Sequence, residues 1–305
     1  MYDLVIIGGG PAGVSAGVYA GRKQLKTLFL TKDFGGQSIV SDDIQNWIGD
    51  ISVSGQKLAE RFENHVTAYS NDFVEVKKGE MVEKITKNED FFGVETDKNK
   101  YETKTILLAT GAHRRKLTVK GSEEFENKGI TYCASCDGPL FANQDVVVVG
   151  GGNAGFETAA QLLAYAKSVT LLEHSAEYKA DAITVEKVLA HPKMTGITNV
   201  SIKEIRGDKF VNSLIYTDTE TNEEKTLSVT GVFVEIGLIP STDFVANIVE
   251  LDEYKRIKID PWSQKTNTEG IWAAGDCTNI IYHQNNIASG DGVRALEDIY
   301  KTLHA

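Results

Sequence analysis

Cys133 and Cys136 are separated by two residues, and Asp137 follows the second cysteine directly. Two thiols at this C-x-x-C spacing can close a small disulfide ring, and one of them often ionises near neutral pH. The carboxyl group of Asp137 could pass a proton to a leaving thiolate. The motif alone fits half a zinc site, a structural disulfide or a redox dithiol.

The composition of the chain favours the redox dithiol. A zinc site needs two further ligands, but Cys277 is the only other cysteine and none of the six histidines forms a close-spaced pair. Three cysteines in 305 residues are also too few for a disulfide framework. We therefore predict a redox-active disulfide and no metal, and we expect Cys277 to be a small buried residue.

The first residues of the chain follow a nucleotide-binding pattern of strand, glycine turn, helix and strand. In sequence order these are residues 4–7, Gly8, Gly10 and Gly13 in G-x-G-x-x-G spacing, residues 14–21 and residues 27–30. In this pattern the first glycine allows a tight turn and the second lets a pyrophosphate approach the backbone. The third glycine lets the helix pack closely on the strand, and the order of the elements makes the pattern specific.

The same pattern recurs after the C-x-x-C motif. Four valines at 146–149 fit a strand buried on both faces, and Gly150, Gly152 and Gly155 repeat the spacing before a helix that runs to about residue 166. The next strand, residues 168–172, is followed by Glu173. A carboxylate about 20 residues beyond the turn is typical of a site that binds an adenosine ribose with a free 2′-hydroxyl.

The rest of the chain supplies the elements that must position these motifs. We expect a helix over residues 55–69, strands within 73–108, a hairpin-rich segment over 199–239, an apolar strand that closes on Gly275 and Asp276, and a terminal helix over 289–302. We expect Trp47, Trp262 and Trp272 to pack in the core or beside a cofactor. The length of 305 residues favours two domains.

The net charge of -11 is spread along the chain without a long acidic or basic block. Nucleic acids and anionic membranes attract clustered Lys and Arg, so we expect neither as a partner. No apolar run approaches the ~20 residues that span a bilayer, and the first residues carry no secretory signal pattern. We therefore expect a cytoplasmic protein.

Two nucleotide sites and one dithiol in the same chain suggest electron transfer between cofactors. Side chains alone cannot carry out hydride chemistry, and a flavin is the usual bridge from a nicotinamide to thiols. The sequence thus predicts transfer from a nicotinamide to a flavin, to the Cys133–Cys136 disulfide, and on to a substrate disulfide.

With these motifs, the chain resembles the low-molecular-weight thioredoxin reductase family over essentially its whole length. The motifs that carry the resemblance are Gly8–Gly13, Gly35–Gln37, Asn46–Trp47, Ala109–Gly111, Cys133–Gly138, Gly150–Gly155 and Gly275–Asp276. The stretches 136–141, 173–181 and 275–277 look more similar to the flavoprotein component of alkyl hydroperoxide reductase. That component normally has an additional N-terminal thioredoxin-like domain, which we do not expect in this chain.

The resemblance implies an α/β fold with two Rossmann-like domains of three-layer ββα type, the second inserted in the first. Residues 1–112 and 244–305 would form the FAD-binding domain, and residues 113–243 the pyridine-nucleotide-binding domain that carries the redox motif. The resemblance also implies a homodimer, and rotation of the inserted domain about linkers near residues 113–118 and 240–245.

The resemblance further implies a role for individual residues. Cys133 would attack the partner disulfide, Cys136 would lie against the flavin, and Asp137 would donate and accept the proton. The implied FAD contacts are Gly8, Gly10, Pro11, Ala12, Gly13, Gly35, Gly36, Gln37, Asn46, Val82, Ala109, Thr110, Gly111, Gly275, Asp276, Gln284, Asn285 and Ile287. The implied dinucleotide contacts are Gly150, Gly152, Asn153, Ala154, Gly155, Glu173, His174, Lys179 and Gly237.

The second site departs from NADPH-using members of the family, which carry a histidine and several arginines after the second strand. Here Glu173 would repel a 2′-phosphate, and only His174 and Lys179 are left as phosphate partners. We therefore predict a thioredoxin-disulfide reductase-like oxidoreductase that prefers NADH to NADPH. Its electron acceptor would be a separate thioredoxin-like or glutaredoxin-like protein.

Four alternatives stay open on the sequence. They are an NADPH-dependent thioredoxin reductase, a ferredoxin-linked relative, a thiol oxidase of the same flavoprotein family, and a redox-responsive binding protein with an incidental flavin.

Overall fold

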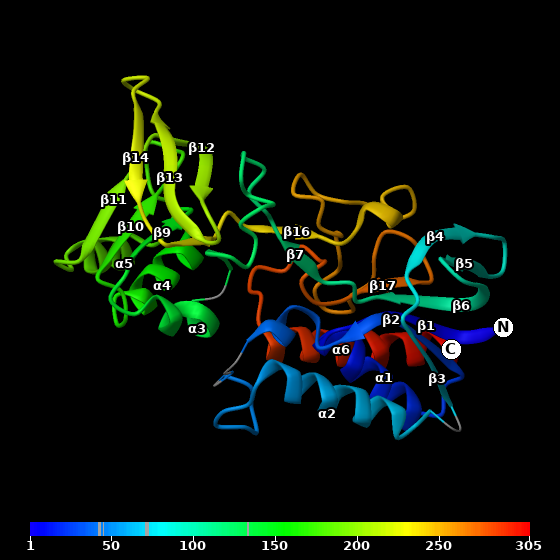
Figure 1. The fold of residues 1–305 in the computed structure, drawn as a ribbon. Helices are drawn as coiled ribbons and strands as arrows, with labels where there is room; N and C mark the ends of the chain where they lie inside the picture. Colours follow the sequence, from blue (N-terminus) through cyan, green and yellow to red (C-terminus); the bar gives the residue numbers. More distant parts are fainter. Residues whose placement is uncertain (42–43, 45, 71–72, 133) are drawn as a thin grey trace. The chain divides into compact units, whose positions relative to one another are not determined.

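The computed structural model describes residues 1–41, 44, 46–70, 73–132 and 134–305. The chain divides into two compact units, coloured along the sequence in Figure 1. Unit 1 comprises Met1–His113 and Ile239–Ala305, and unit 2 comprises Arg114–Leu238, so the second unit is inserted in the first. The cofactor that each unit binds remains a prediction.

Unit 1 is built on a mixed seven-stranded sheet in the order β3-β2-β1-β6-β5-β4, with β17 also paired to β6. The strands are β1 (Tyr2–Gly9), β2 (Thr27–Phe34), β3 (Val74–Lys78), β4 (Val82–Lys87), β5 (Phe92–Thr96), β6 (Lys100–Leu108) and β17 (Ile271–Ala273). The helices are α1 (Pro11–Arg22), η1 (Gly36–Val40), α2 (Gly55–Thr67), η3 (Asp243–Val245) and α6 (Asn285–Leu303). Strands β1, β2, β3, β6 and β17 pair in parallel, whereas β4, β5 and β6 form an antiparallel meander.

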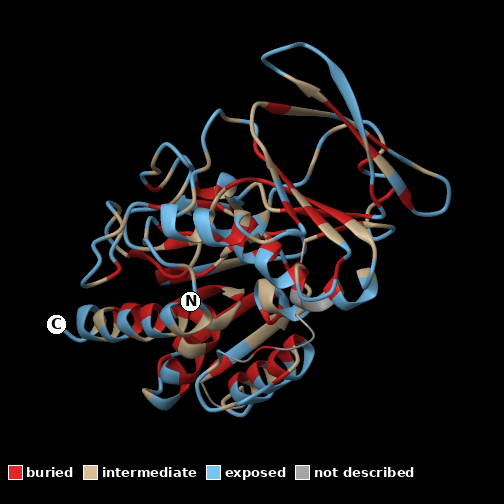
Figure 2. Ribbon diagram, turned by 90° about the vertical axis from the view of Figure 1, so that its left-hand side faces the viewer, coloured by how far each residue is buried: buried red, intermediate tan, exposed pale blue. Residues whose placement is uncertain are grey.

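Alternation along β1 divides the core of unit 1 into two layers. Leu4 and Ile6 pack with α1, α2 and α6, which lie together beneath the sheet in Figure 1. Val5 and Ile7 point to the other face and pack with residues of β5, β6 and β17. Because successive strand residues face opposite sides, one strand serves both layers, and Figure 2 shows the buried residues of the sheet in red between exposed surfaces.

Unit 2 repeats this layered plan around a parallel sheet in the order β11-β10-β9-β15-β8. Its parallel strands are β8 (Ile130–Thr131), β9 (Asp145–Val149), β10 (Ser168–Leu172), β11 (Met194–Ile197) and β15 (Gly231–Val234). A separate antiparallel sheet contains β12 (Val200–Gly207), β13 (Val211–Asp218) and β14 (Glu224–Ser228). The helices are α3 (Ala134–Asp137), η2 (Gly138–Phe141), α4 (Asn153–Leu162) and α5 (Ala182–Leu189).

The valine run in β9 is buried on both faces, as the sequence predicted. Val146 and Val148 pack towards α4 and α5, while Val147 and Val149 pack towards the antiparallel sheet. The predicted fold class is therefore confirmed, with each parallel sheet covered by helices on one face and by β-structure on the other.

The chain passes from one unit to the other in two short strands. They are β7 (Ala112–Arg114) and β16 (Leu238–Pro240), which pair in a two-stranded sheet. On the unit 1 side the Ser241 N–H donates to Gly111 O, and on the unit 2 side the Arg115 N–H donates to Gly237 O.

Three details differ from the sequence prediction. Trp262 does not pack in a core, because 86% of it is exposed on a turn whose backbone N–H groups are held by Asp260. The terminal helix starts at Asn285 rather than near residue 289, and α5 and β11 were not predicted at all. Of the helices in the described part of the chain, none is long and apolar enough to cross a bilayer.

Candidate nucleotide-binding and dithiol sites

The first glycine turn joins β1 to α1 at the carboxyl end of the unit 1 sheet. Gly8 has a φ of +121°, and a Cβ atom there would lie 2.1 Å from the carbonyl oxygen of Ala109. A Cβ atom on Gly13 would lie 1.9 Å from the carbonyl oxygen of Gly8. Glycine is therefore required at both positions, because a side chain would separate the helix from the strand.

Helix α1 presents its N-terminus at this turn. Pro11 occupies the first turn, and no side chain in the described part of the chain caps it. Unpaired backbone N–H groups and the positive end of the helix dipole make such a terminus attractive to phosphate. Gly36 lies directly opposite, since a Cβ atom on it would be 3.3 Å from the Cα atom of Gly10. The turn thus keeps an open, side-chain-free approach for a diphosphate.

Polar side chains from distant segments surround this cradle. Gln37 Nε2 donates to Asp276 Oδ2 at 3.3 Å, and Ser38 Oγ donates to Asn285 Oδ1 at 2.9 Å. Asn46 Nδ2 donates to Gln284 Oε1 at 3.1 Å. Residues near 40 and near 280 that the sequence assigned to one cofactor therefore lie together.

Asp276 has one carboxylate oxygen left over. Its Oδ1 is buried and makes no hydrogen bond within the described residues, although His283 Nδ1 lies 3.4 Å away. A buried carboxylate oxygen without a donor is costly, so this position suits a hydroxyl-bearing ligand. The unpaired oxygen, the open glycine turn and the helix N-terminus together fit FAD, which supplies a diphosphate and a hydroxylated chain.

The remaining residues predicted for the first cofactor vary in their placement. Gly275 packs on the start of α1, because a Cβ atom on it would be 3.2 Å from Ala12 Cβ. Thr110 Oγ1 donates to Ser241 O at 2.8 Å, and Ile287 is exposed in the first turn of α6. Val82 begins β4, where it pairs with Thr96 and packs in the Val5–Ile7 layer, and no hydrogen bond of the described residues connects it to the cradle.

The second glycine turn, in unit 2, repeats the geometry of the first. Gly150 has a φ of +119°, and a Cβ atom there would lie 2.2 Å from the carbonyl oxygen of Glu235. A Cβ atom on Gly155 would lie 1.8 Å from Gly150 O, whereas one on Gly152 would meet nothing within 4 Å. Open space at the middle glycine is what a diphosphate needs, so this turn also fits a dinucleotide.

Glu173 follows β10 and folds its carboxylate onto the second turn. Its Oε2 accepts from the Gly151 N–H at 2.7 Å and its Oε1 from the Ser175 N–H at 2.8 Å. Burial alone would raise the pKa of Glu173, but these two hydrogen bonds and the charge of Lys179 outweigh it and hold the pKa below its usual range. Each oxygen still has a free lone pair, so the ionised carboxylate can accept a ribose hydroxyl.

The other residues predicted for the dinucleotide lie around the same loop. His174 is exposed and its Nδ1 donates to Val200 O at 3.1 Å, while the Lys179 N–H donates to Gly151 O at 2.9 Å. Asn153 Oδ1 accepts from the Asp181 N–H at 2.9 Å, which ties the loop to the start of α4. Ala154 is exposed beside it, and Gly237 has a φ of +96° with open space around it.

The dithiol can be placed only in part. Cys133 lies outside the described residues, and Cys136 is in the short helix α3. Asp137 ends that helix, and its carboxylate accepts a hydrogen bond from Thr131 Oγ1 at the end of β8. The predicted roles of the three residues therefore remain predictions.

One charged group at the second turn was not predicted from the sequence. Glu235 follows β15, and its carboxylate accepts from Arg114 Nη1 at 3.2 and 3.3 Å and from Thr158 Oγ1 at 2.9 Å. The available signal was an acidic residue between an apolar strand and Gly237. Its partner Arg114 is 121 positions away in sequence, so no local pattern could reveal the pair.

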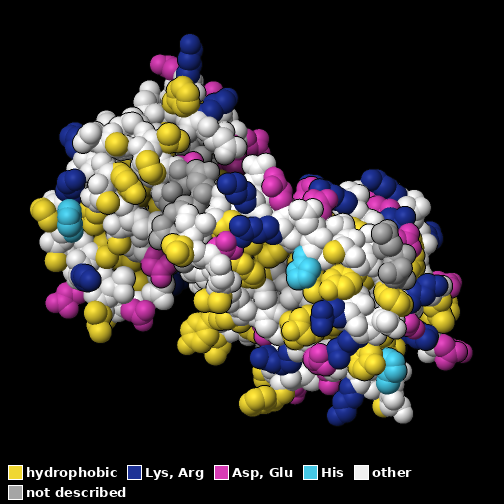
Figure 3. Space-filling view, turned by 90° about the horizontal axis from the view of Figure 1, so that it is seen from below, with side chains coloured by type: hydrophobic (Ala, Val, Ile, Leu, Met, Phe, Trp, Pro, Cys, Tyr) yellow, Lys and Arg dark blue, Asp and Glu magenta, His cyan; other side chains and the backbone are white. Residues whose placement is uncertain are grey.

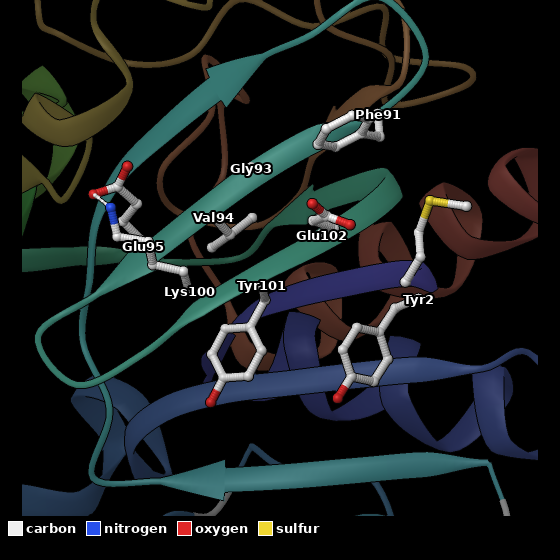
Figure 4. A pocket seen from close by; sticks show the side chains of 9 residues that line it. Tyr2, Phe91, Gly93, Val94, Glu95, Lys100, Tyr101 and Glu102 are labelled. Carbon is white, nitrogen blue, oxygen red and sulfur yellow. Dashed lines mark ion pairs between the residues drawn. The ribbon is translucent and has the colours of Figure 1, made fainter.

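The surface outside these sites offers little further chemistry. A shallow pocket of about 420 Å³ lies beside β5 and β6, lined by Tyr2, Tyr101 and an ion pair between Glu95 and Lys100 at 3.2 Å (Figure 4). It contains none of the predicted site residues. On the face drawn in Figure 3 the described acidic and basic side chains are interspersed, with no block of one sign.

Comparison with known proteins gives a consistent result. A model of the pyridine nucleotide-disulphide oxidoreductase family matches residues 2–292. A protein named NADH dehydrogenase from Bacillus subtilis is 40% identical over 96% of this chain, and the alkyl hydroperoxide reductase F component of Pseudomonas aeruginosa is 37% identical over 96%. The chain spans 57% of the length of each of these curated relatives.

Solved structures match over the full chain. Thioredoxin reductase from Lactococcus lactis superposes with a TM-score of 0.83 at 34% identity and covers 100% of this chain and 99% of its own. Thioredoxin reductase from T. acidophilum gives a TM-score of 0.81 at 36% identity with the same coverage. The resemblance drawn from the sequence is confirmed, and the chain belongs to the pyridine nucleotide-disulphide oxidoreductase family, with the fold of thioredoxin reductases.

Proposed function

We propose that this protein is an FAD-dependent disulfide reductase that takes electrons from NADH. FAD binds in unit 1 and NADH in unit 2, and the Cys133–Cys136 disulfide passes two electrons to a thioredoxin-like or glutaredoxin-like protein. Membership of the family supports the flavin and a pyridine nucleotide as cofactors. The relatives whose names refer to NADH dehydrogenase and to alkyl hydroperoxide reductase support the reduced donor and a thiol-linked pathway.

The observation that carries the choice of NADH is the placement of Glu173. Its ionised carboxylate is 7% exposed and hydrogen-bonded to the backbone of the glycine turn. A 2′-phosphate placed at this carboxylate would meet like charge, whereas a 2′-hydroxyl can donate to it. His174 does not offset the repulsion, because its Nδ1 is occupied by Val200 O.

The chain's own residues divide the work between the two units. The α1 N-terminus and Asp276 bind the first cofactor, which supplies two-electron chemistry between a nicotinamide and thiols. The α4 N-terminus and Glu173 bind and orient the dinucleotide. Cys136 exchanges electrons with the flavin, Cys133 attacks the partner's disulfide, and Asp137 holds the proton that the leaving thiolate takes.

We further propose a homodimer in the cytoplasm. Both follow from the family resemblance, and three cysteines in 305 residues suit a reducing compartment. Light scattering of the purified FAD-bound protein tests the dimer, and a monomer's mass would contradict it.

An anaerobic titration tests the order of electron transfer. NADH should bleach the flavin of the purified enzyme, and the enzyme should then reduce a thioredoxin disulfide. Cys133→Ser should remove disulfide reduction while the flavin still bleaches with NADH. Loss of both reactions in a variant that still binds FAD would contradict the assigned order.

A further inference from the structure

The point where the dinucleotide crosses the unit 2 sheet is flanked by Gly150 and Glu235. The chain leaves β9 towards β10 and β11 on one side, and β15 returns on the other side of β9. Val149 pairs with Val234, so the residues that follow the two strands are direct neighbours. In open α/β sheets the ligand lies outside the carboxyl ends of the strands at such a switch point.

Glu235 carries a largely buried charge at this position. Its side chain is 11% exposed, Thr158 Oγ1 donates to Oε1, and Arg114 Nη1 lies within 3.3 Å of both oxygens. Burial raises the pKa of Glu235, while the charge of Arg114 and the hydrogen bond from Thr158 act in the opposite direction. Glu157 on α4 is the other acidic group that acts on it.

Arg114 is the more accessible member of the pair. It is the first residue of unit 2, in β7, and 37% of its side chain is exposed. The guanidinium keeps its charge at every working pH, so Glu235 decides whether the switch point carries a net positive charge. The two charges cancel as long as both are present.

We propose that Glu235 neutralises Arg114 so that the switch point accepts the positively charged nicotinamide of NAD⁺ as well as the neutral ring of NADH. The pair is thus a specificity-determining element for the oxidation state of the dinucleotide. This inference rests on the proposed function. Thr158 holds the carboxylate in position and contributes no charge.

A charge-balance experiment tests the proposal. Dissociation constants of NAD⁺ and NADH are measured by calorimetry on the FAD-bound enzyme and on the variants Glu235→Gln, Glu235→Gln/Arg114→Gln and Thr158→Val. Glu235→Gln leaves Arg114 unbalanced, so it should weaken NAD⁺ roughly three- to tenfold relative to NADH, the size expected of one unit charge across a partly solvated site. The double variant should restore the wild-type ratio to within about twofold, and Thr158→Val should leave it there.

Two results would overturn the proposal. Equal weakening of both dinucleotides by Glu235→Gln would mark a packing role, and so would a double variant that keeps the altered ratio. Thermal melting identifies variants that fail to fold. Wild-type enzyme that binds neither dinucleotide would instead contradict the proposed function, so the two failures are distinguishable.

Discussion

Replacing Glu173 with Gln should weaken unit 2 and relax the choice of dinucleotide. The carboxylate accepts from the Gly151 and Ser175 N–H groups with separate oxygens at 2.7 and 2.8 Å. A Gln side chain has one acceptor oxygen, so one N–H must face an NH₂ group and lose its partner. A buried unpaired N–H costs about 1–3 kcal/mol and the loss of charge assistance adds to it, so we expect unfolding to become easier by about 2–3 kcal/mol.

The assay has to report on unit 2 specifically. All three tryptophans lie in unit 1, so tryptophan fluorescence would follow the wrong unit. Hydrogen exchange of peptides that cover residues 146–173 measures the opening of the affected sheet directly. Glu177→Gln removes the same charge from an exposed position on the same loop and serves as the control. Equal exchange in the two variants would refute the reasoning.

The pH dependence gives a second check on the same residue. The pKa of Glu173 is lowered in the folded protein, so its ionised form stabilises the fold above the unfolded pKa of about 4.3. That stabilisation is lost as the pH falls through the folded pKa. In urea unfolding followed by circular dichroism, the deficit of Glu173→Gln should be full at pH 7 and should shrink in acid. A deficit that does not change with pH would assign the effect to packing.

Three further predictions follow from close contacts and exposure. Gly155→Ala should unfold unit 2 or abolish dinucleotide binding, because its Cβ would lie 1.8 Å from a backbone oxygen, whereas Gly152→Ala should fold normally and lose affinity for NADH in calorimetry. Normal binding by Gly152→Ala would show that no diphosphate passes there. Cys277→Ala should keep full disulfide reductase activity with a small loss in melting temperature, since this thiol is completely buried and burial raises its pKa; a loss of reductase activity would reveal a third redox thiol. Trp262→Ala should leave the melting temperature unchanged, whereas Trp272→Ala should cost about 3–5 kcal/mol as a fully buried aromatic residue; similar melting of both variants would contradict the burial of Trp272.

The sequence predicted best those features whose cause is local. The glycine turns and the buried valine strand follow from steric limits and side-chain alternation within a few residues, and the structure has them where they were expected. Glu173 was identified because its distance from the turn is fixed by one helix and one strand. Local geometry therefore carries most of the candidate site.

Features that depend on distant partners were not predictable in this way. Arg114 meets Glu235 only after the sheet of unit 2 is assembled, and neither residue belongs to a recognisable motif. The exposure of Trp262 is decided by the turn that Asp260 stabilises, whereas residue type alone favoured burial. In both cases the tertiary environment overrides the preference of the residue.

The most direct test of the proposed electron donor is a pair of anaerobic stopped-flow traces. They record bleaching of the enzyme-bound flavin at equal concentrations of NADH and NADPH. We predict that NADH bleaches the flavin at least about tenfold faster, because a 2′-phosphate must approach the ionised carboxylate of Glu173. Equal or faster bleaching by NADPH would contradict the assignment of the donor.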